Sequence, residues 1–454
     1  MMKQRIIVPH NHYIGDETFE TQVERSFCDD RNLNENPYPC ANITFQVTED
    51  CNLACTYCYQ HNKSKKRMTF DVAKKALDLI MVDETYVKVR DKRGVILDFI
   101  GGEPLLEIDL IEQIYQYFIE KCIALNHPWM DCHRISMCSN GVLYQDEKVK
   151  RFIGKYQDVL SFTISVDGPK DVHDACRIFH NGQGSFSYAF DAMKSVQKTF
   201  GVKNTKATIA PENVHNLSKL VKFFYEENGF DTILLNCTYE GPWDIETAKT
   251  FYHELIKISD YCYANDTYEK LYIALFEEDM CQPIDLSIPG EDKNWCGGCG
   301  QMIAINPDGN IYPCLRYMES SLGDSIDPVI IGTVSHGIAC TECEVKWIQQ
   351  MNQVTLTSQS TEECIHCPIA KGCGWCSAHN YEKFGTFNHR DTEICIMHKM
   401  RALANIDYWN RFYEKHHVKN VYENFLPKDE MIRLVGEKET NRLLNIIENQ
   451  RKVV

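Results

Sequence analysis

The sequence ANITFQVTEDCNLACTYCYQ, residues 41–60, joins a strand pattern to three closely spaced cysteines. Residues 41–48 are rich in β-branched and aromatic side chains, which favours a β-strand. Cys51, Cys55 and Cys58 follow in one loop, with three and two residues between them. A loop with this spacing can wrap three thiolates around three irons of a four-iron cluster and leave the fourth iron open. An open iron can chelate the amino and carboxylate groups of a methionine moiety, so we expect cofactor chemistry in this loop.

The strand pattern recurs along the chain between segments with helical apolar spacing. The six predicted strands are residues 41–48, 95–100, 133–138, 159–166, 205–210 and 232–238. The predicted helices lie near residues 70–90, 109–125, 146–156, 185–200, 213–228 and 244–264. This alternation predicts a parallel sheet with right-handed crossovers. Six units are fewer than the eight of a closed barrel, so the predicted α/β fold is an open, partial (β/α)6 barrel.

Turn-forming and polar residues follow the ends of the second, third and fourth predicted strands. The sequences are GGEP at 101–104, SNG at 139–141 and SVDGP at 165–169. In a parallel sheet the carboxyl ends of the strands and the loops after them form the active face. The paired glycines of GGEP would let the backbone approach a ligand closely. We therefore expect these loops to surround the same site as the three cysteines.

The residues CNLACTYCYQ, with an aromatic residue before the last cysteine, closely resemble the signature of radical S-adenosylmethionine (radical SAM) enzymes. A zinc knuckle also clusters thiols, but the three other loops agree with the radical SAM family. The resemblance implies that an electron from the cluster reductively cleaves S-adenosylmethionine to a 5′-deoxyadenosyl radical. It further implies that the cofactor is contacted by Tyr57, Gly101, Gly102, Glu103, Ser139, Ser165 and Arg177. Glu103 can accept hydrogen bonds from an ammonium group, and Arg177 suits a carboxylate, although a surface ion pair is the alternative for Arg177.

Eight further cysteines follow residue 295 in regular spacings. WCGGCGQMIAINPDGNIYPC supplies Cys296, Cys299 and Cys314, with a glycine at 309 in a predicted hairpin. CIHCPIAKGCGWC and a later EIC supply the others, which are Cys364, Cys367, Cys373, Cys376 and Cys395. Eight thiols suffice for two four-iron clusters or for two zinc sites, so spacing alone does not choose the metal.

This second pattern resembles the SPASM domain of radical enzymes that modify peptides, which carries two auxiliary [4Fe–4S] clusters. The resemblance implies a first auxiliary cluster held by Cys296, Cys299, Cys314 and Cys376. It implies a second cluster held by Cys364, Cys367, Cys373 and Cys395. Only two residues separate Cys373 from Cys376, one fewer than in the usual pattern. With the first cysteine loop, the resemblance predicts three [4Fe–4S] clusters.

Three other cysteines are weaker candidates. Cys340 and Cys343 form a lone CxxC, which we interpret as unligated, with transient ligation of the first auxiliary cluster as the alternative. Cys237, at the end of the sixth predicted strand, is interpreted as a core thiol. The alternative for Cys237 is donation of a hydrogen atom to a substrate radical.

Composition narrows the possible environment and partners. The chain has 454 residues, 22 of them cysteine, and a formal net charge of −16. The negative charge disfavours nucleic-acid binding, and the basic run KSKKR at 63–67 is interpreted as a solvated loop. No apolar stretch reaches the roughly 18 residues of a membrane helix, and no secretory signal is recognised at the start. We therefore expect a cytoplasmic protein without a membrane or nucleic-acid partner, in which clustered cysteines bind metal.

The predicted organisation has five parts. Residues 1–40 precede the first strand and are fewer than a complete leader-peptide-binding domain needs. We interpret the leader site as truncated here, with a site formed jointly with other parts or supplied by another chain as the alternatives. The radical SAM barrel occupies 41–240, a helical bridge 241–295, the SPASM domain 296–400 and a helical tail 401–454.

Three functions compete. The first is a maturase that installs a crosslink, preferably a thioether, in a ribosomally synthesised precursor peptide, with epimerisation and carbon–carbon or carbon–oxygen crosslinking as variants. CLRY at 314–317 is typical of this class. The second is an anaerobic sulfatase (formylglycine) maturase, which by resemblance uses an aspartate directly after the hairpin cysteine, where this chain has Leu315. The third is an electron carrier, for which an open cluster site has no use. The first function implies a precursor peptide with a leader and an electron donor such as a flavodoxin or ferredoxin.

Overall fold

The computed structural model describes residues 40–82, 94–292, 296, 298, 300, 302–418 and 425–452. Several predicted features lie wholly or partly outside these residues. They are the leader-binding segment up to residue 39, the end of the helix predicted near 70–90, Cys299, the end of the helical bridge, and parts of the helical tail.

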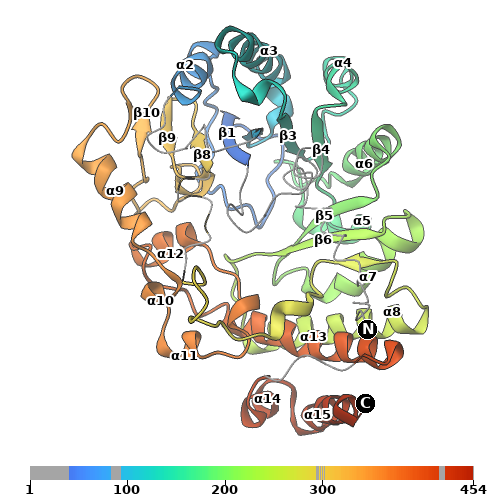
Figure 1. The fold of residues 1–454 in the computed structure, drawn as a ribbon. Helices are drawn as coiled ribbons and strands as arrows, with labels where there is room; N and C mark the ends of the chain where they lie inside the picture. The colour runs from blue at the N-terminus through green and yellow to red at the C-terminus, as the bar shows by residue number, and fades with distance from the viewer. Residues whose placement is uncertain are drawn as a thin grey trace, which may run out of the picture.

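Parallel strands form the centre of the molecule (Figure 1). β1 (Cys40–Thr48), β2 (Gly94–Gly101), β3 (His133–Ser139) and β4 (Leu160–Ile164) pair in chain order. A second sheet contains β5 (Asn204–Ile209), β6 (Thr232–Cys237) and β7 (Tyr272–Ile273), and a bridge between Ser165 and Lys206 continues β4 into β5. The six predicted strands are therefore present and parallel, and the open α/β barrel is confirmed.

The opposite edge of the barrel is extended by the cysteine-rich part of the chain. β8 (Met302–Ile305) pairs in parallel with β1 and continues through an antiparallel hairpin into β9 (Asn310–Tyr312). β10 (Gly332–Thr333) and β11 (Gly337–Ile338) complete this eight-stranded sheet. The hairpin turns at Gly309, whose φ of +84° favours glycine. The barrel sheet thus runs across the predicted boundary between the radical SAM and SPASM domains.

The two faces of β1 show why the site lies inside the barrel. The apolar residues Ala41, Ile43, Phe45 and Val47 are fully buried among the surrounding side chains. The alternate residues are polar and point to the inner side, because successive side chains of a strand point to opposite faces. Gln46, for example, donates through Nε2 to Oγ of Ser320 at 2.8 Å. The barrel therefore packs its helices on an apolar outside and keeps a polar interior.

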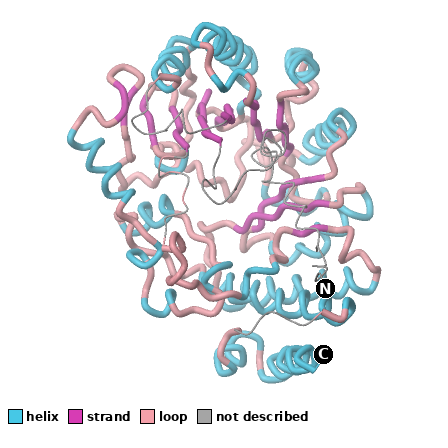
Figure 2. The backbone as a smooth tube through the Cα atoms, in the orientation of Figure 1, coloured by secondary structure: helices cyan, strands magenta, loops and turns pink. Residues whose placement is uncertain are grey.

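Helices cover the outside of the barrel (Figures 1 and 2). They are α2 (Phe70–Ile80), α3 (Ile108–Leu125), α4 (Glu147–Tyr156), α5 (Lys170–Cys176), α6 (Phe186–Phe200), α7 (Leu217–Lys222) and α8 (Ile245–Ala264). Side chains of Thr69, Asp146 and Asp244 cap α2, α4 and α8 by accepting backbone N–H bonds. The helix predicted at 213–228 is broken, since a 3₁₀ turn at Val214–Asn216 precedes α7 and a π-helical turn at Phe223–Glu227 follows it.

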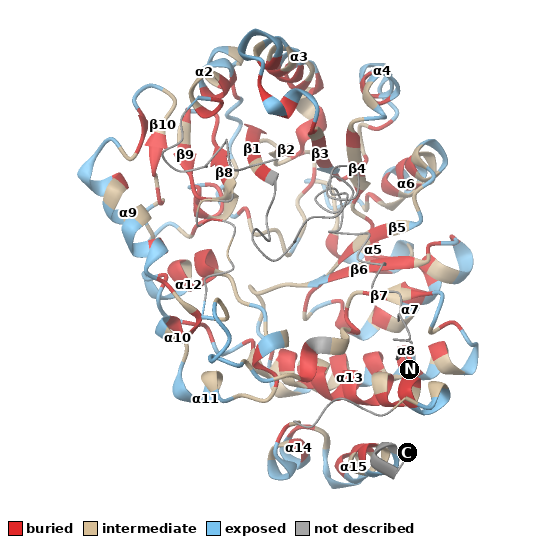
Figure 3. Cartoon of the chain, in the orientation of Figure 1, coloured by how far each residue is buried: buried red, intermediate tan, exposed pale blue. Residues whose placement is uncertain are grey.

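The chain after β11 is mostly helical, with several short helices and two longer ones. The short ones are α9 (Glu342–Asn352), α10 (Leu356–Gln359), α11 (Glu362–Ile365), α12 (Ser377–Phe384) and α14 (Lys428–Val435). The tail helices are α13 (Cys395–His416) and α15 (Glu437–Lys452). α13 packs along α8 and is buried over much of its length (Figure 3). Among the described residues, no helix is long and apolar enough to cross a membrane.

Candidate active site

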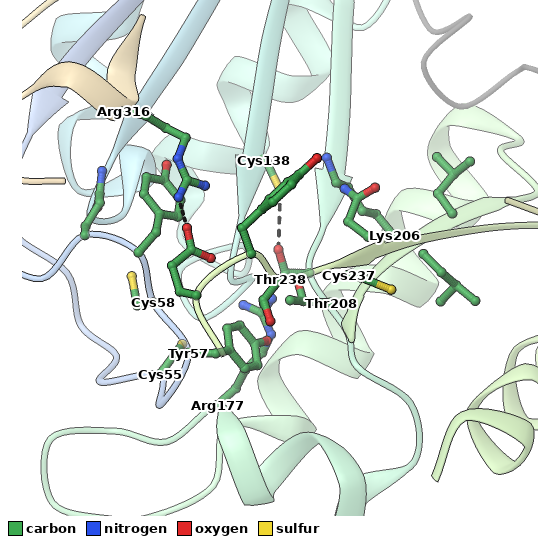
Figure 4. Close-up of a pocket in the computed structure, with 18 of the residues that line it drawn as sticks. Cys55, Tyr57, Cys58, Cys138, Arg177, Lys206, Thr208, Cys237, Thr238 and Arg316 are labelled. Carbon is green, nitrogen blue, oxygen red and sulfur yellow. Dashed lines mark hydrogen bonds and ion pairs between the residues drawn. The ribbon is translucent and has the colours of Figure 1, made fainter. Parts of the chain in front are cut away.

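A cavity of about 820 Å³ occupies the inner side of the barrel (Figure 4). The loops after β1 to β4 supply one wall, and it includes all three cysteines of the first motif. Strands β5 and β6 and the chain after β6 supply a second wall. Residues of the cysteine-rich part and of α13 complete the lining. The predicted loops do converge on one site, and the carboxy-terminal half of the chain closes it.

The first cysteine loop is fixed by the segment that follows α5. Ala54 N–H donates to the carbonyl of Ile178 at 2.7 Å, and Thr56 N–H donates to Cys176 at 3.0 Å. His180 Nε2 lies 2.9 Å from the carbonyl oxygen of Cys51. Backbone pairing of this kind holds the loop in one shape, so the thiols are presented to the cavity before any ligand binds.

The donor chemistry of this loop suits a multi-iron cluster. Burial raises the pKa of Cys51 to about 11 and also raises the pKa of Cys55. Burial opposes the charge of Lys63, but the thiols of Cys58 and Cys51 hold the pKa of this amine above its ordinary value. Such thiols ionise when a cation binds them, and Lys63 offsets the resulting negative charge.

The spacing of the donors also argues against a single ion. Among the described residues, no three His, Cys, Asp or Glu side chains converge closely enough to hold one metal ion. Three cavity-lining thiols on one loop are the kind of donor that a multi-iron cluster uses.

The glycines of GGEP are required by the protein chain itself. A Cβ at Gly102 would lie 2.3 Å from the carbonyl oxygen of Asp50 and 2.7 Å from Cβ of Cys51. A Cβ at Gly101 would lie 2.8 Å from the carbonyl oxygen of Thr48. Both glycines also line the cavity. Their first role is to let the end of β2 pack against the cysteine loop.

Glu103 ties neighbouring loops together. Its Oε1 accepts from Ser139 Oγ at 2.8 Å and from Leu105 N–H at 3.1 Å, and its Oε2 accepts from Asn140 N–H at 2.9 Å. Burial raises the pKa of this carboxyl group, and the three donors oppose the rise. A carboxylate offers about four acceptor positions, and Glu103 lines the cavity. The predicted contact with a cofactor ammonium group stays a prediction.

Arg177 belongs to a buried group. Its Nε donates to Oδ2 of the fully buried Asp167 at 2.9 Å, and Tyr57 O–H donates to the same carboxylate. The guanidinium carbon lies 5.4 Å from the centroid of the Tyr57 ring (Figure 4). The alternative of a surface ion pair is therefore wrong. Ser165 also reaches the cavity and lies 3.3 Å from Cys138, from oxygen to sulfur.

The described thiols of the second motif fall into two spatial groups. In the first, burial and then the thiols of Cys296 and Cys376 raise the pKa of Cys314 well above its ordinary range. Ser377 Oγ donates to the sulfur of Cys296 at 3.1 Å. Cys376 thus lies beside the hairpin cysteines, across the chain from its sequence neighbours. Cys299 lies outside the described residues.

The second group contains the other four cysteines. Burial raises the pKa of Cys395 to about 11, and the thiols of Cys373, Cys367 and Cys364 act in the same direction. The two groupings follow the sets implied by the SPASM resemblance. Ligation of clusters by these sets stays a prediction.

Comparison of the sequence with known protein families identifies one domain. The Radical SAM superfamily model matches residues 45–224, which include the first cysteine loop and strands β1 to β5. The chain therefore contains a radical SAM domain at residues 45–224. The radical SAM family uses S-adenosylmethionine and a [4Fe–4S] cluster, which agrees with the predicted cofactor at this level. The roles of Cys51, Cys55 and Cys58 stay predictions.

The radical SAM protein is similar to maturases over most of its length. It is 24% identical to the cysteine-type anaerobic sulfatase-maturating enzyme of Clostridium novyi over 347 residues, 72% of this chain and 83% of the relative. It is 23% identical to the subtilosin biosynthesis protein AlbA of Bacillus subtilis over 358 residues, 76% of this chain and 68% of the relative.

A third relative matches a shorter part of the chain. The uncharacterized protein MJ0907 of Methanocaldococcus jannaschii is 30% identical over 185 residues, 40% of this chain and 57% of the relative.

Solved structures show the same fold. The structure of anSMEcpe with bound AdoMet covers 83% of this radical SAM protein and 99% of its own chain, with a TM-score of 0.59 and 18% identity. The structure of Streptococcus suis SuiB with its precursor peptide SuiA covers 84% and 88%, with a TM-score of 0.52 and 15% identity. The α/β radical SAM fold with a cysteine-rich, partly helical second half is therefore confirmed.

The weaker cysteine candidates lie in different surroundings. Cys340 and Cys343 are exposed, and the thiol of Cys340 donates to the carbonyl of His336 at 2.8 Å. Cys237 lines the cavity, and burial raises its pKa to about 12, which keeps it a thiol. The interpretation of Cys340 and Cys343 as unligated, and the role of Cys237, stay predictions.

Several cavity residues of the radical SAM protein were not foreseen. They are Lys63, Cys138, Lys206, Thr208, Asn236, Tyr239, Glu240, Arg316, His398 and Arg401. The interpretation of KSKKR as a solvated loop was wrong for Lys63, which lies at the cysteine loop. Alternation along β5 could have pointed to Lys206 and Thr208, because both side chains leave the strand on one face. Nothing in the sequence brings Glu240 and Arg316 together.

Proposed function

We propose that this radical SAM enzyme matures a ribosomally made peptide by joining a cysteine sulfur to a carbon atom, which forms a thioether. One observation carries the proposal: a continuous cavity is lined by the first cysteine loop at one place and by the chain next to Cys314 at another. A substrate in this cavity lies between a source of radicals and a second group of thiols. The relatives agree, because AlbA is named for subtilosin biosynthesis and SuiB was solved with a precursor peptide.

The reaction needs this arrangement for its electron balance. When bound, the cofactor and its cluster supply a 5′-deoxyadenosyl radical, which removes a hydrogen atom from a substrate carbon. Closing a carbon–sulfur bond then releases one proton and one electron. An oxidised auxiliary [4Fe–4S] cluster would accept this electron, and the two thiol groups are the residues that would hold such clusters. We propose three clusters in all, reduced by a donor such as a flavodoxin or ferredoxin.

The residues of the cavity have defined tasks in this proposal. The Arg177–Asp167–Tyr57 group holds a guanidinium in place for the cofactor carboxylate. The buried Glu103 holds the loops after β2 and β3 against the cysteine loop. Apolar side chains such as Leu234 and Leu235 line the space between the walls and exclude water from a reactive radical.

A sulfatase maturase is the second candidate. The Clostridium relative is named for this activity, and anSMEcpe was solved with the Cp18Cys peptide. Leu315 begins the 3₁₀ turn Leu315–Tyr317 at the position where the resemblance implies an aspartate. An apolar side chain cannot accept a proton, so the residue at this position favours the thioether maturase.

The two candidates give different products from peptides with a cysteine. Anaerobically reconstituted enzyme is incubated with S-adenosylmethionine, dithionite and either the Cp18Cys peptide or a Cys-bearing peptide encoded beside its gene. A thioether maturase removes two hydrogens and one alkylatable thiol from the second peptide. A formylglycine maturase leaves an aldehyde that reacts with a hydrazide. An unchanged mass with an inverted stereocentre identifies an epimerase, and lost hydrogens with every thiol alkylatable identify a carbon–carbon or carbon–oxygen link.

The Cys51→Ala/Cys55→Ala/Cys58→Ala variant tests the site itself. It is expected to lose all cleavage of S-adenosylmethionine and about one third of the iron if three four-iron clusters assemble. Retained cleavage in this variant would contradict the proposed function.

A further inference from the structure

An ion pair joins the barrel to the cysteine-rich part inside the cavity. Glu240 follows the end of β6, and Arg316 lies two residues after Cys314. The Arg316 guanidinium is paired with the Glu240 carboxylate, and Figure 4 draws this ion pair as a dashed line at Arg316. Each side chain is about one fifth exposed, at 22%. Both residues line the cavity, so the pair faces a bound substrate.

The pair lies between the first cysteine loop and the first auxiliary group. The Arg316 guanidinium carbon is 5.2 Å from the ring centroid of Tyr59. Tyr59 has Cys58, Arg316 and Cys314 within electrostatic reach. Tyr239 has Cys376 and Arg316 within the same reach. An electron that leaves the substrate sulfur for the first auxiliary group would therefore pass near the Glu240–Arg316 pair.

Few groups in the cavity can accept a proton. Glu103 already accepts three hydrogen bonds. Glu277 pairs with Arg401 of α13 at 3.1 Å, whereas Glu240 pairs with an arginine two residues after Cys314. Burial lowers the pKa of His398 to about 3, which makes this imidazole a weak base. Glu240 is the remaining carboxylate of the described lining, which it shares with the first cysteine loop.

We propose that Glu240 accepts the proton of the substrate thiol, and that Arg316 positions its carboxylate. This inference rests on the proposed function. The substrate carbon radical and the thiol form the carbon–sulfur bond, the S–H proton goes to the Glu240 carboxylate, and the surplus electron goes to an oxidised [4Fe–4S] cluster of the first auxiliary group. Glu240 then returns the proton to water through its exposed part.

Glu240→Gln in the reconstituted full-length enzyme tests the proposal. With a Cys-bearing peptide that the wild-type enzyme modifies, 5′-deoxyadenosine formation and iron content are expected to stay within about twofold. Formation of the crosslinked peptide is expected to fall on the order of 10²- to 10⁴-fold, the usual contribution of a general base. Glu382→Gln is the matched control, because Glu382 is 21% exposed, accepts from Gly323 N–H, and lies outside the described cavity lining.

A substrate that is already deprotonated shows whether Glu240 acts as a base or only supports the structure of the cavity. A selenocysteine peptide carries a selenol that is already ionised at neutral pH, so it should restore crosslinking by Glu240→Gln. Crosslinking of the ordinary peptide by this variant should rise as pH approaches the pKa of a free thiol, near 8.5. Arg316→Gln should lower crosslinking less than Glu240→Gln, since the carboxylate remains.

The outcomes separate failure of the proposed function from failure of the proposed role of Glu240. If wild-type enzyme modifies no cysteine peptide, the proposed function fails and the role of Glu240 fails with it. If wild-type enzyme crosslinks the peptide and Glu240→Gln is equally active, the function stands and the role of Glu240 is wrong. If the selenocysteine peptide restores nothing, Glu240 acts only through the structure of the cavity wall, and the proposal is overturned.

Discussion

His173 is a buried side chain whose charge state supports the site indirectly. Its Nδ1 lies 3.3 Å from the backbone nitrogen of Asp167, and its Nε2 lies 3.0 Å from Oγ of Ser185. Burial, with Arg177 nearby, lowers its pKa from 6.5 to about 4. The unfolded chain therefore binds this proton more readily than the folded protein does. The contribution to stability is complete above pH 6.5 and is lost as pH falls toward 4.

We predict that His173→Gln reduces the acid sensitivity of folding. A pKa difference between 6.5 and about 4 corresponds to roughly 3 kcal/mol of stability gained across that pH range. The free energy of unfolding, measured by denaturant titration at pH 7 and pH 4.5, should therefore fall less steeply in the variant. The same slope in both proteins would show that His173 is not the titrating group.

Gly102 offers a second test at a single position. Gly102→Ala places a Cβ against Asp50 and Cys51, where backbone must move. We predict that the variant folds but binds less iron in the first cysteine loop and cleaves S-adenosylmethionine at least tenfold more slowly. Gly154→Ala is the control, because a Cβ there meets nothing within 4 Å and alanine favours a helix by about 1 kcal/mol. Iron analysis and thermal melting distinguish the two.

The pair of helices α8 and α13 depends on one buried carboxylate. Asp407 on α13 is fully buried and accepts from Ser259 Oγ at 2.7 Å. It also pairs with Arg411 on its own helix and with Arg442 on α15. α13 carries Cys395 at its start and reaches the cavity through Arg401. The position of one thiol group and one cavity wall therefore depends on this packing.

Asp407→Asn should destabilise the protein by about 1.5–3 kcal/mol, since it removes a fully buried charged acceptor of Ser259, Arg411 and Arg442. Asp260→Asn is the matched control, because Asp260 pairs with Arg411 at 2.7 Å but is 60% exposed. An exposed pair contributes about 0–1 kcal/mol. Chemical denaturation of both variants tests this difference, and equal losses would contradict it.

The two halves of the molecule are joined through shared structure rather than through a linker. β8 extends the barrel sheet by pairing with β1, and the Glu240–Arg316 pair crosses the cavity. Cys376 lies with Cys296 and Cys314, although its sequence neighbours lie with Cys395. The chain between Cys373 and Cys376 therefore connects the two proposed auxiliary sites.

Cys376→Ser is predicted to remove the first auxiliary cluster and to spare the second. About four of twelve irons should be lost if all three clusters assemble in the wild-type enzyme. Cleavage of S-adenosylmethionine should remain within a few fold, while the crosslinked peptide should disappear because the electron has no acceptor. Mössbauer spectra of this variant and of Cys395→Ser should show losses of different clusters. Identical spectra for the two variants would show that the thiols do not form separate sites.

The first cysteine motif, the six parallel strands and the cysteine-rich second half were all readable from local sequence. Each depends on neighbours within a few residues: the spacing of thiols on one loop, the alternation within a strand, and the turn residues at strand ends. The loops predicted to contact the cofactor could be placed together for the same reason, because they follow consecutive strands of a parallel sheet. Even the two groups of auxiliary thiols follow from a spacing pattern together with a family resemblance.

Tertiary structure alone decided which residues face one another across the cavity. Glu240 and Arg316 are 76 positions apart, and neither lies in a spacing that points to the other. Arg177 took a buried partner instead of a surface one, because the chain after α5 turns inward to hold the cysteine loop. Lys63 belongs to a basic run, yet it lines the cavity beside the first cysteine loop. Long-range contacts of this kind arise from packing whole elements together, and no local pattern records them.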